Sequence, residues 1–157
     1  MLIDDAWFYT SHRTLHTKWL YKHVHSWHHE LHHSNVLGGE YSHPFEYLIG
    51  NVLPSAAGLL LLGKHTHIFT YCIYISYRIT EGVEAHGGYE FPWTMTHWLP
   101  FGCSVDHHDH HHRCNKGNFG SFFIIWDTIC GTNQPYYKEL DRAEKKDDLK
   151  ESAKLKT

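Results

Sequence analysis

The sequence predicts an all-α, membrane-associated helical bundle that carries a histidine-rich di-metal site on its cytosolic side. Three observations support this fold class. Histidines recur three and four residues apart in three separate segments, and this spacing places side chains on one face of a helix. Two apolar runs follow each other in the middle of the chain. The first is close to the roughly 20 residues that are needed to cross a bilayer. A segment dense in Lys, Glu and Asp then closes the sequence.

Composition places the chain among proteins with one compact domain. Its 157 residues are enough for a single core, which we expect at residues 1–137, followed by a charged tail at 138–157 that is a solvated helix or disordered. The net charge of −3 indicates no basic surface for nucleic acid. The four cysteines form no CxxC pair and no disulfide framework, which predicts free thiols in a reducing compartment.

Residues 4–33 predict a long helix, continuous or broken once near its middle. Acidic residues at 4 and 5 suit a helix start, and no proline or glycine occurs before Gly38. The segment sets His12 and His16 four residues apart and then places three more histidines, His25, His28 and His29, at spacings of three and four. His33 continues the spacing at the end of the helix. If the segment is helical, it presents two patches of imidazole.

The next helix is predicted to begin at Pro44. Gly38 and Gly39 end the first helix, and Ser42-His43-Pro44 has the composition of a turn with proline at the first helical position. His43 and Glu46 allow two interpretations of equal weight. They either cap and shape this turn, or they orient metal-ligating imidazoles from behind.

Residues 45–63 and 68–79 are strongly apolar, and residues 64–67 separate them. Together they predict a helical hairpin that enters the membrane and returns. Gly50, Pro54 and Gly58 in the first run are more tolerable in a membrane helix than in a soluble one. A buried hairpin in a soluble bundle is the alternative, and the sequence favours the membrane.

The end of the second apolar helix carries a further histidine, His86, as a possible ligand. Glu81, Glu84 and Glu90 are carboxylates that we expect within reach of the same site. Residues 91–105 are rich in aromatic side chains and contain two prolines. They predict an irregular loop that lies at the membrane interface, where tryptophan concentrates, or covers an apolar substrate as a lid.

The third histidine patch lies at residues 106–112, with the sequence DHHDHHH. Two registers of HxxHH fit it, His107/His110/His111 and His108/His111/His112, and spacing alone does not choose between them. Eight or nine imidazoles exceed the four ligands of a structural zinc site and fit two metal ions with open coordination positions. Imidazole suits iron, copper and zinc alike. Combined with a membrane hairpin, such a site predicts chemistry on a lipid, most plausibly oxygen activation at a di-iron centre.

A series of motifs extends over about residues 4–133 in fixed order. The motifs are Asp5-x-x-Phe8-Tyr9, His12-Arg13-x-Leu15-His16, Tyr21-Lys22, His25-x-x-His28-His29-Glu30, Glu40-Tyr41-x-His43-Pro44-x-Glu46, His86-x-Gly88-Tyr89, His107-His108-Asp109-x-His111-His112, Asn118-Phe119 and Trp126-Asp127-x-x-x-Gly131-Thr132. In wording, order and spacing they closely resemble the sterol desaturase and fatty acid hydroxylase superfamily of membrane di-iron oxygenases. Within that superfamily the nearest resemblance is to C-4 methylsterol oxidases.

The resemblance implies a ligand set and selects the second register of the third patch. The implied metal ligands are His12, His16, His25, His28, His29, His86, His108, His111 and His112. It further implies two iron ions, for which zinc can substitute in purified protein, with molecular oxygen as the oxidant. Electrons are expected from NAD(P)H through cytochrome b5 or a similar carrier, at the endoplasmic reticulum membrane. His110 departs from the family, whose members usually carry an aromatic residue there, and so adds a possible ligand or supporting group.

By the same resemblance the expected reaction is stepwise oxidation of a sterol C-4 methyl group. The segments at 40–46 and 81–89 favour this substrate over a fatty acyl chain, a ceramide, a sterol side chain or an aldehyde. A non-catalytic, histidine-rich metal-binding membrane protein is the alternative from another class, although a metal buffer would not need three ordered histidine boxes. Family members carry membrane helices before the first box, so we expect that this chain is N-terminally truncated or keeps the hairpin as its reduced anchor.

Overall fold

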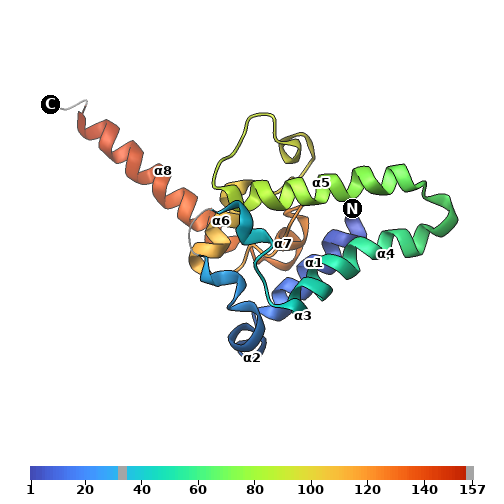
Figure 1. Cartoon of the computed structure of the whole chain (residues 1–157). Coiled ribbons are helices and arrows are strands. Elements are labelled where there is room, and N and C mark those ends of the chain that lie inside the picture. The colour runs from blue at the N-terminus through green and yellow to red at the C-terminus, as the bar shows by residue number, and fades with distance from the viewer. Residues whose placement is uncertain (32–34, 155–157) are drawn as a thin grey trace.

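The computed structural model describes residues 1–31 and 35–154, and all regular elements within them are helical (Figure 1). The α-helices are α1 (Leu2–Leu15), α2 (Lys18–Leu20), α3 (Pro44–Glu46), α4 (Leu53–Leu62), α5 (Ile68–Gly87), α6 (Val105–Cys114), α7 (Ile125–Cys130) and α8 (Gln134–Lys154). Shorter π- and 3-10 turns lie between them: η1 (Tyr21–His25), η2 (His28–Glu30), η3 (Val36–Gly39), η4 (Tyr47–Val52), η5 (Gly63–His65) and η6 (Met95–Trp98). The all-α prediction is therefore confirmed. The predicted continuation of the first helix through His33 lies outside the described residues.

The helix predicted over residues 4–33 is broken near its middle, which was one of the two forms expected for it. α1 ends at Leu15, and Thr17 has an extended backbone with φ −66° and ψ 146°. Beyond the break the chain does not resume a regular α-helix. The amide of Ser26 donates to the carbonyl of Tyr21 at 2.8 Å, a five-residue step that marks the π-helix η1. This wider turn and the tight turn η2 together set the directions of the histidines at 25, 28 and 29.

The predicted apolar hairpin is present. His43 caps its first helix by accepting a hydrogen bond from the amide of Phe45 at 3.2 Å, with Pro44 at the first helical position. α3, η4 and α4 form one continuous helical rod, and α5 runs back from the hairpin tip and diverges from the rod toward the inner end (Figure 1). The chain reverses at Gly63, whose φ of +49° favours glycine. Of the helices described, the one over Pro44–His65 is long and apolar enough to cross a membrane.

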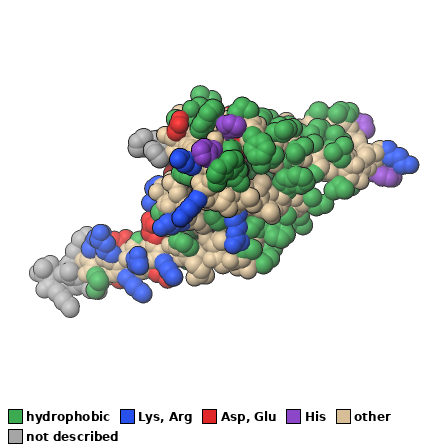
Figure 2. Space-filling model, turned by 90° about the horizontal axis from the view of Figure 1, so that it is seen from below, with side chains coloured by type: hydrophobic (Ala, Val, Ile, Leu, Met, Phe, Trp, Pro, Cys, Tyr) green, Lys and Arg blue, Asp and Glu red, His purple; other side chains and the backbone are tan. Residues whose placement is uncertain are grey.

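The outer end of this hairpin exposes a large apolar surface. Leu60 is 78% exposed, and Leu61 and Phe69 are each 67% exposed. Figure 2 shows apolar side chains covering this elongated part of the molecule, with lysine and histidine at its tip. Apolar surface in water costs about 25 cal/mol per Å², and a contiguous exposed patch of this kind marks a contact with a membrane or a protein. This surface supports the expectation of membrane association.

The interior between the helices is unusually polar. Leu15 and Phe122 are fully buried apolar side chains, but buried histidines and carboxylates surround them. Arg78 of α5 is stacked over Phe122 and lies between two acidic groups. Its guanidinium donates to Glu81 at 2.8 Å and lies 3.6 Å from the carboxylate of Asp4. Because a buried charge is costly unless it is paired, this arrangement holds α1 and α5 together.

Asp5 ties α1 to the segment before α7, and it gives a testable pH dependence. Its Oδ1 accepts a hydrogen bond from the amide of Phe122 at 2.8 Å. Burial raises the pKa of Asp5 to about 7, although hydrogen bonds from two backbone amides, those of Phe122 and Phe123, act to lower it. The folded state therefore holds this proton between about pH 4 and pH 7, where the unfolded chain releases it, so ionisation lowers stability as pH rises through that window.

We expect Asp5→Asn to remove this pH dependence of stability. The amide oxygen of asparagine still accepts the backbone hydrogen bond, but the side chain carries no charge. The variant should match the parent protein in melting temperature near pH 4.5 and exceed it near pH 7.5. Each unit of pKa difference is worth about 1.4 kcal/mol, so the difference between the two proteins should grow by a few kcal/mol. Thermal unfolding of both proteins in the same detergent measures it. A constant difference across this range would contradict the assignment.

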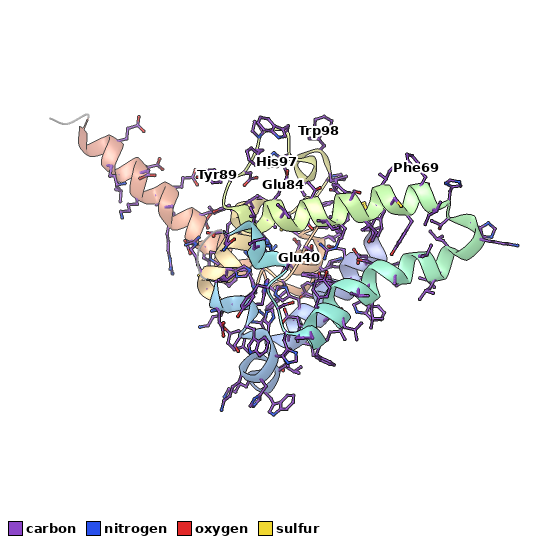
Figure 3. All side chains as sticks on the ribbon, viewed as in Figure 1. Glu40, Phe69, Glu84, Tyr89, His97 and Trp98 are labelled. Carbon is purple, nitrogen blue, oxygen red and sulfur yellow. The ribbon has the colours of Figure 1, made fainter. Side chains whose placement is uncertain are left out.

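Two further segments complete the fold. Residues 88–104 form an irregular loop with only the short turn η6, as predicted, and Trp98 at its outer edge is 78% exposed (Figure 3). Gly102 is required in this loop because a Cβ there would lie 1.8 Å from the carbonyl oxygen of Thr96. The charged tail is the solvated helix α8, which extends away from the body in Figure 1 and runs unbroken across the expected boundary at residue 137.

Candidate metal centre

All nine histidines of the predicted ligand set converge at the inner end of the helices. α1 and the turn after it contribute His12 and His16, while η1, η2 and the residues between them contribute three more. α5 supplies one histidine near its C-terminal end, and α6 supplies three. They form a five-histidine cluster (His12, His16, His25, His29 and His111) and a four-histidine cluster (His28, His86, His108 and His112).

Within the five-histidine cluster the Nε2 atoms point toward one another. His25 Nε2 lies 2.9 Å from His16 Nε2 and 3.1 Å from His29 Nε2. His16 Nε2 lies 3.1 Å from His111 Nε2. The ring of His12 packs against that of His111 with centroids 4.5 Å apart. Imidazoles from sequence positions about 100 residues apart thus share one small volume.

The four-histidine cluster has the same arrangement. His108 Nε2 lies 3.1 Å from His86 Nε2 and 3.1 Å from His112 Nε2. His86 Nε2 lies 3.4 Å from His28 Nε2. The two clusters are adjacent, because the ring centroids of His29 and His112, one from each cluster, are 4.6 Å apart.

The opposite ring nitrogens of five of these histidines are held from outside. His12 Nδ1 donates to the carbonyl of Phe119 at 3.0 Å, and His111 Nδ1 donates to that of Gly117 at 2.6 Å. His86 donates in the same way to the carbonyl of Gly82 at 2.8 Å and His28 to that of Tyr41 at 3.3 Å. His25 Nδ1 has a side-chain partner in place of a backbone carbonyl: it lies 2.7 Å from a carboxyl oxygen of Glu46. Such outer hydrogen bonds fix the orientation and tautomer of metal-ligating histidines.

These contacts test whether the residues fit metal ions. A neutral imidazole whose Nδ1–H is donated outward has only a lone pair on Nε2. In His25, His28, His86 and His111 that lone pair faces the Nε2 atom of another histidine at 2.9–3.4 Å. His25 and His111 both face His16, and His28 and His86 face each other. Two facing lone pairs repel, and Nε2 of His12 is buried with no hydrogen-bond partner. A cation between the Nε2 atoms resolves both problems, so the donor set fits two metal ions.

Burial also favours the protonation state that metal binding needs. It lowers the pKa of His12 to about 4 and that of His16 to about 2. For His28, His108 and His111, burial is again the largest cause of a lowered pKa, followed by the neighbouring imidazoles. Only an unprotonated imidazole nitrogen binds a metal ion. At pH 7 these imidazoles are therefore already neutral, so metal binding does not have to remove protons from them.

The register of the third patch, left open by spacing, is the second one in the structure. His108, His111 and His112 turn into the two clusters, whereas the other two histidines of α6 face away. His107 Nδ1 lies 3.3 Å from Cys103 Sγ, and its Nε2 is buried without a partner. His110 is buried on the side of α8, where it pairs with Glu139 at 3.1 Å.

The carboxylates expected near His86 do not join either cluster, which corrects that expectation. Glu81 accepts hydrogen bonds from Arg78 and Ser121. Glu84 accepts from Thr94 at 3.2 Å, and Glu90 pairs with His97 in the exposed loop. Because a helix turns by about 100° per residue, positions 81 and 84 of α5 do not share the direction of His86 closely enough to reach the same centre.

The backbone carbonyls that anchor the histidines are functional groups that sequence reasoning missed. They belong to Tyr41, Gly82, Gly117 and Phe119, whose side chains carry no information about this role. Among these residues, the glycine at position 117 is the one whose type gives a sequence signal. The structure requires glycine there, because its φ is +73° and a Cβ would lie 2.0 Å from the carbonyl oxygen of Thr132. Of the two residues proposed as supports, Glu46 takes that role in the structure, while His43 makes the helix-capping contact.

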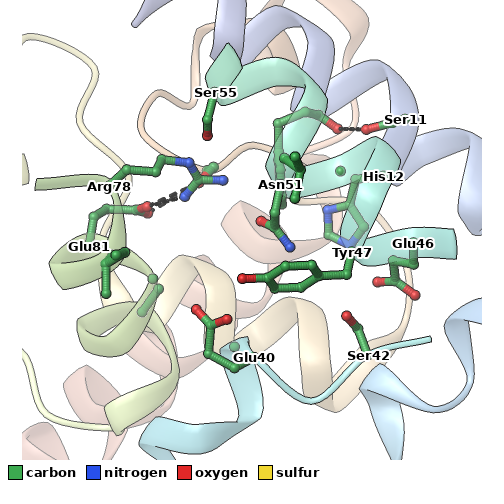
Figure 4. A pocket seen from close by; sticks show the side chains of 18 of the residues that line it. Ser11, His12, Glu40, Ser42, Glu46, Tyr47, Asn51, Ser55, Arg78 and Glu81 are labelled. Atoms are coloured by element: carbon green, nitrogen blue, oxygen red, sulfur yellow. Dashed lines mark hydrogen bonds and ion pairs between the residues drawn. The ribbon is translucent and has the colours of Figure 1, made fainter. Parts of the chain in front are cut away.

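A cavity of about 310 Å³ borders the centre between α1, α4 and α5. His12, His25, His28, His86 and His108 line its inner wall. Figure 4 shows polar side chains that project toward the same space, among them Asn51, Ser55 and the paired Arg78 and Glu81. Apolar side chains from α1 and α5 supply the remaining walls: Phe8, Leu15, Ile75 and Ile79.

Glu46 gives a direct test of the outer support. We expect Glu46→Ala to lower metal affinity by about 10–100-fold, because His25 loses the acceptor that fixes its tautomer and ring direction. Glu46→Gln keeps an acceptor oxygen at the same distance and should retain most of the affinity. The rate of metal loss to a chelator, measured for the purified variants, separates the two. Equal loss in Ala and Gln variants would show that the carboxylate charge, and not the hydrogen bond, matters.

Comparisons with known proteins show which family the chain belongs to. The family model described as fatty acid hydroxylase matches residues 1–132. The chain is 43% identical over 147 residues to the very-long-chain aldehyde decarbonylase GL1-8 of Oryza sativa subsp. indica, covering 92% of this chain and 54% of that protein. It is 40% identical over 154 residues to the methylsterol monooxygenase 2-2 of Arabidopsis thaliana, covering 96% of this chain and 56% of that protein.

A third relative is the C-4 methylsterol oxidase erg25 of Schizosaccharomyces pombe, 34% identical over 138 residues, covering 87% of this chain and 46% of that protein. The chain thus spans about half the length of the relatives it matches. No solved structure matches it. Since the family model covers most of the sequence, including every predicted ligand, the chain belongs to the fatty acid hydroxylase family of the sterol desaturase superfamily.

Proposed function

We propose that the protein is a membrane-associated di-iron oxygenase that oxidises a lipid, and that its substrate is a sterol oxidised at the C-4 methyl group. The observation that carries the proposal is the convergence of nine imidazoles, through their ring nitrogens, in two adjacent clusters. Two iron ions held there would supply the activation of molecular oxygen, with electrons from NAD(P)H delivered through cytochrome b5 or a similar carrier.

The chain's own contribution begins with holding neutral ligands in place. Imidazoles add no negative charge, so they leave the charge of the two metal ions available to the reaction. The outward hydrogen bonds to backbone carbonyls, such as those of Phe119 and Gly117, keep the ligand rings from turning when the charge at the centre changes. The carboxyl group of Glu46 does the same for His25.

The cavity beside the centre would position the substrate and keep water away. Its apolar walls of Phe8, Leu15 and Ile79 suit a lipid ring system. Its polar wall offers hydroxyl and amide groups to the single hydroxyl of a sterol, which is attached to the carbon next to C-4. Exclusion of water protects a reactive oxidant from side reactions. A lipid can reach this cavity from the apolar hairpin, because α4 and α5 form two of its walls.

The exposed apolar hairpin supports residence in a membrane, for which we propose the endoplasmic reticulum. The aromatic loop at residues 88–104 would lie at the bilayer interface, since the residues that line the cavity come from other segments.

The test is a reconstituted assay with detergent-solubilised, iron-loaded protein. We expect an iron content near two equivalents, and oxygen uptake when a 4,4-dimethylsterol and reduced cytochrome b5 are added together. Mass spectrometry should find the C-4 alcohol, aldehyde and acid in succession. Iron binding without oxygen uptake on any lipid would instead support a metal-binding protein without catalysis.

A very-long-chain aldehyde is the second candidate substrate, and a specific observation favours it. The rice relative named as an aldehyde decarbonylase is 43% identical over 147 residues, against 40% for the Arabidopsis methylsterol monooxygenase. The same assay with a long-chain aldehyde discriminates between them, because loss of one carbon from the chain and oxidation of a sterol methyl group give different products.

A further inference from the structure

We propose that His110, Cys114 and Glu139 form a third metal site, separate from the two histidine clusters and suited to Zn²⁺, that fastens α8 to α6. The nine histidines of the proposed di-iron centre are not involved, and the inference does not depend on the reaction catalysed. Ligand atoms of these three residues lie within 4.8 Å of one another. His110 and Cys114 are four residues apart on α6 and so share one face, and Glu139 approaches them from α8.

The distances match a tetrahedral zinc shell. His110 Nε2 lies 3.6 Å from Cys114 Sγ and 3.1 Å from a carboxylate oxygen of Glu139. Zinc bonds of about 2.3 Å to sulfur and 2.0–2.1 Å to nitrogen or oxygen, at a tetrahedral angle, place sulfur and nitrogen about 3.5 Å apart and nitrogen and oxygen about 3.3 Å apart. Small movements of the two exposed side chains, Cys114 and Glu139, would therefore place three of the four ligands of a tetrahedral zinc ion.

The chemistry of the donor set distinguishes this site from the main centre. It combines one imidazole nitrogen, one thiol sulfur and one carboxylate oxygen, whereas the two clusters consist of imidazole alone. Thiolate ligands select zinc over iron(II), and the mixture of nitrogen, sulfur and oxygen is typical of zinc. A thiolate and a carboxylate balance the two charges of the ion, so binding leaves no excess charge.

Neighbouring residues hold the ligands before any metal arrives. The imidazole of His110 is almost fully buried, and its Nε2 is turned toward Glu139. Arg113 donates to the other carboxylate oxygen of Glu139 at 3.2 Å and to Asp109 at 3.0 Å. Cys114 is exposed and forms no disulfide, so an ion can reach the site from solvent. Because the ligands are prepositioned, binding needs little ordering of side chains.

The consequence is a fastening between the tail and the helix that carries three of the cluster histidines. In the structure α8 meets α6 through Glu139 and through Tyr136, whose hydroxyl donates to Asp106 at 2.9 Å. Beyond these contacts α8 projects away from the body (Figure 1). A metal ion at the third site would convert a partly exposed ion pair, which contributes little by itself, into a bond network that spans both helices.

The test uses the full chain with its iron sites loaded, titrated with Co²⁺ as a spectroscopic probe and then with Zn²⁺. We expect one further equivalent of Co²⁺ and a near-ultraviolet charge-transfer band, which only a thiolate ligand produces. Cys114→Ser should abolish the band, while the matched control Cys130→Ser, another exposed cysteine, should retain it. Glu139→Gln and His110→Phe should each weaken Zn²⁺ binding at least tenfold.

A band that persists in Cys114→Ser would overturn the proposal, as would wild-type protein that takes up no Co²⁺ beyond its iron. Zinc affinity unchanged in both Glu139→Gln and His110→Phe would also overturn it, because binding would then rest on the thiol alone. Iron content, measured in every variant, confirms that the main centre and the fold are intact. This separates the result from any failure of the proposed oxygenase activity.

Discussion

Replacing His111 by alanine is expected to remove metal from the five-histidine cluster and to abolish oxidation. His111 is completely buried, and its Nε2 lies 3.1 Å from that of His16 while its Nδ1 is anchored to Gly117 at 2.6 Å. Outer partners of metal ligands are worth about 10–100-fold in affinity, so loss of a ligand itself should exceed 100-fold. Metal analysis and the oxygen-uptake assay on the same preparation measure both effects.

The control for this variant is His107→Ala, on the same helix and equally buried but outside both clusters. Both variants remove a buried imidazole from α6, so a similar loss of stability is expected from each, and only His111→Ala should lose metal. His28→Ala extends the test to the four-histidine cluster. Full activity with normal iron content in either His111→Ala or His28→Ala would refute the assignment of these clusters as the metal centre.

Asp127→Ala is expected to have the largest effect on stability. The carboxylate is fully buried and belongs to the first turn of α7. Its two oxygens accept hydrogen bonds from the amides of Phe119 at 2.9 Å and Gly120 at 2.7 Å and from the hydroxyl of Thr132 at 2.6 Å. Alanine leaves the two backbone amides without their acceptor, while the Thr132 hydroxyl keeps Tyr9 as a partner. Since each buried unpaired donor costs about 1–3 kcal/mol, we expect a loss of about 2–6 kcal/mol in the free energy of unfolding.

The loss should reach the metal centre as well, because Phe119 is the residue whose carbonyl anchors His12. Asp127→Asn keeps the size and one acceptor oxygen, and it should fall between alanine and the parent protein. Thermal unfolding in detergent and the rate of iron loss to a chelator measure the two consequences. A variant that loses stability but keeps iron as tightly as the parent would show that the loop does not position His12.

Much of the fold followed from local pattern. The spacing of histidines and the two apolar runs predicted the helices and the hairpin, and Ser42-His43-Pro44 predicted the helix start that the structure has at Pro44. These features depend on residues close together in the sequence, so a short stretch contains the physical information. The break in the first helix was one of two expectations. Its form was not predictable, since the π-turn at Tyr21–His25 packs against α1 and α3, which come from other parts of the chain.

The candidate site shows the same division. The spacing of the histidines marked three patches and His86 as a further candidate, but it left the register of the third patch open, and the resemblance to the family selected His108, His111 and His112. The sequence did not identify Asp127, whose partners are backbone amides seven and eight residues away. It placed Glu81 near the ligands, whereas the structure pairs this carboxylate with Arg78.

By itself, then, the sequence determined the helical class, the apolar hairpin and the histidine patches, since each depends on residue type and local periodicity, while the choice of ligands within the third patch rested on the resemblance to the family. Only the tertiary structure decided how nine imidazoles divide into groups of five and four. It also decided which carbonyls hold them and which histidines of α6 face outward. The reason is that these outcomes depend on distances between segments up to about 100 residues apart in the chain, and those distances are set by packing of the whole bundle.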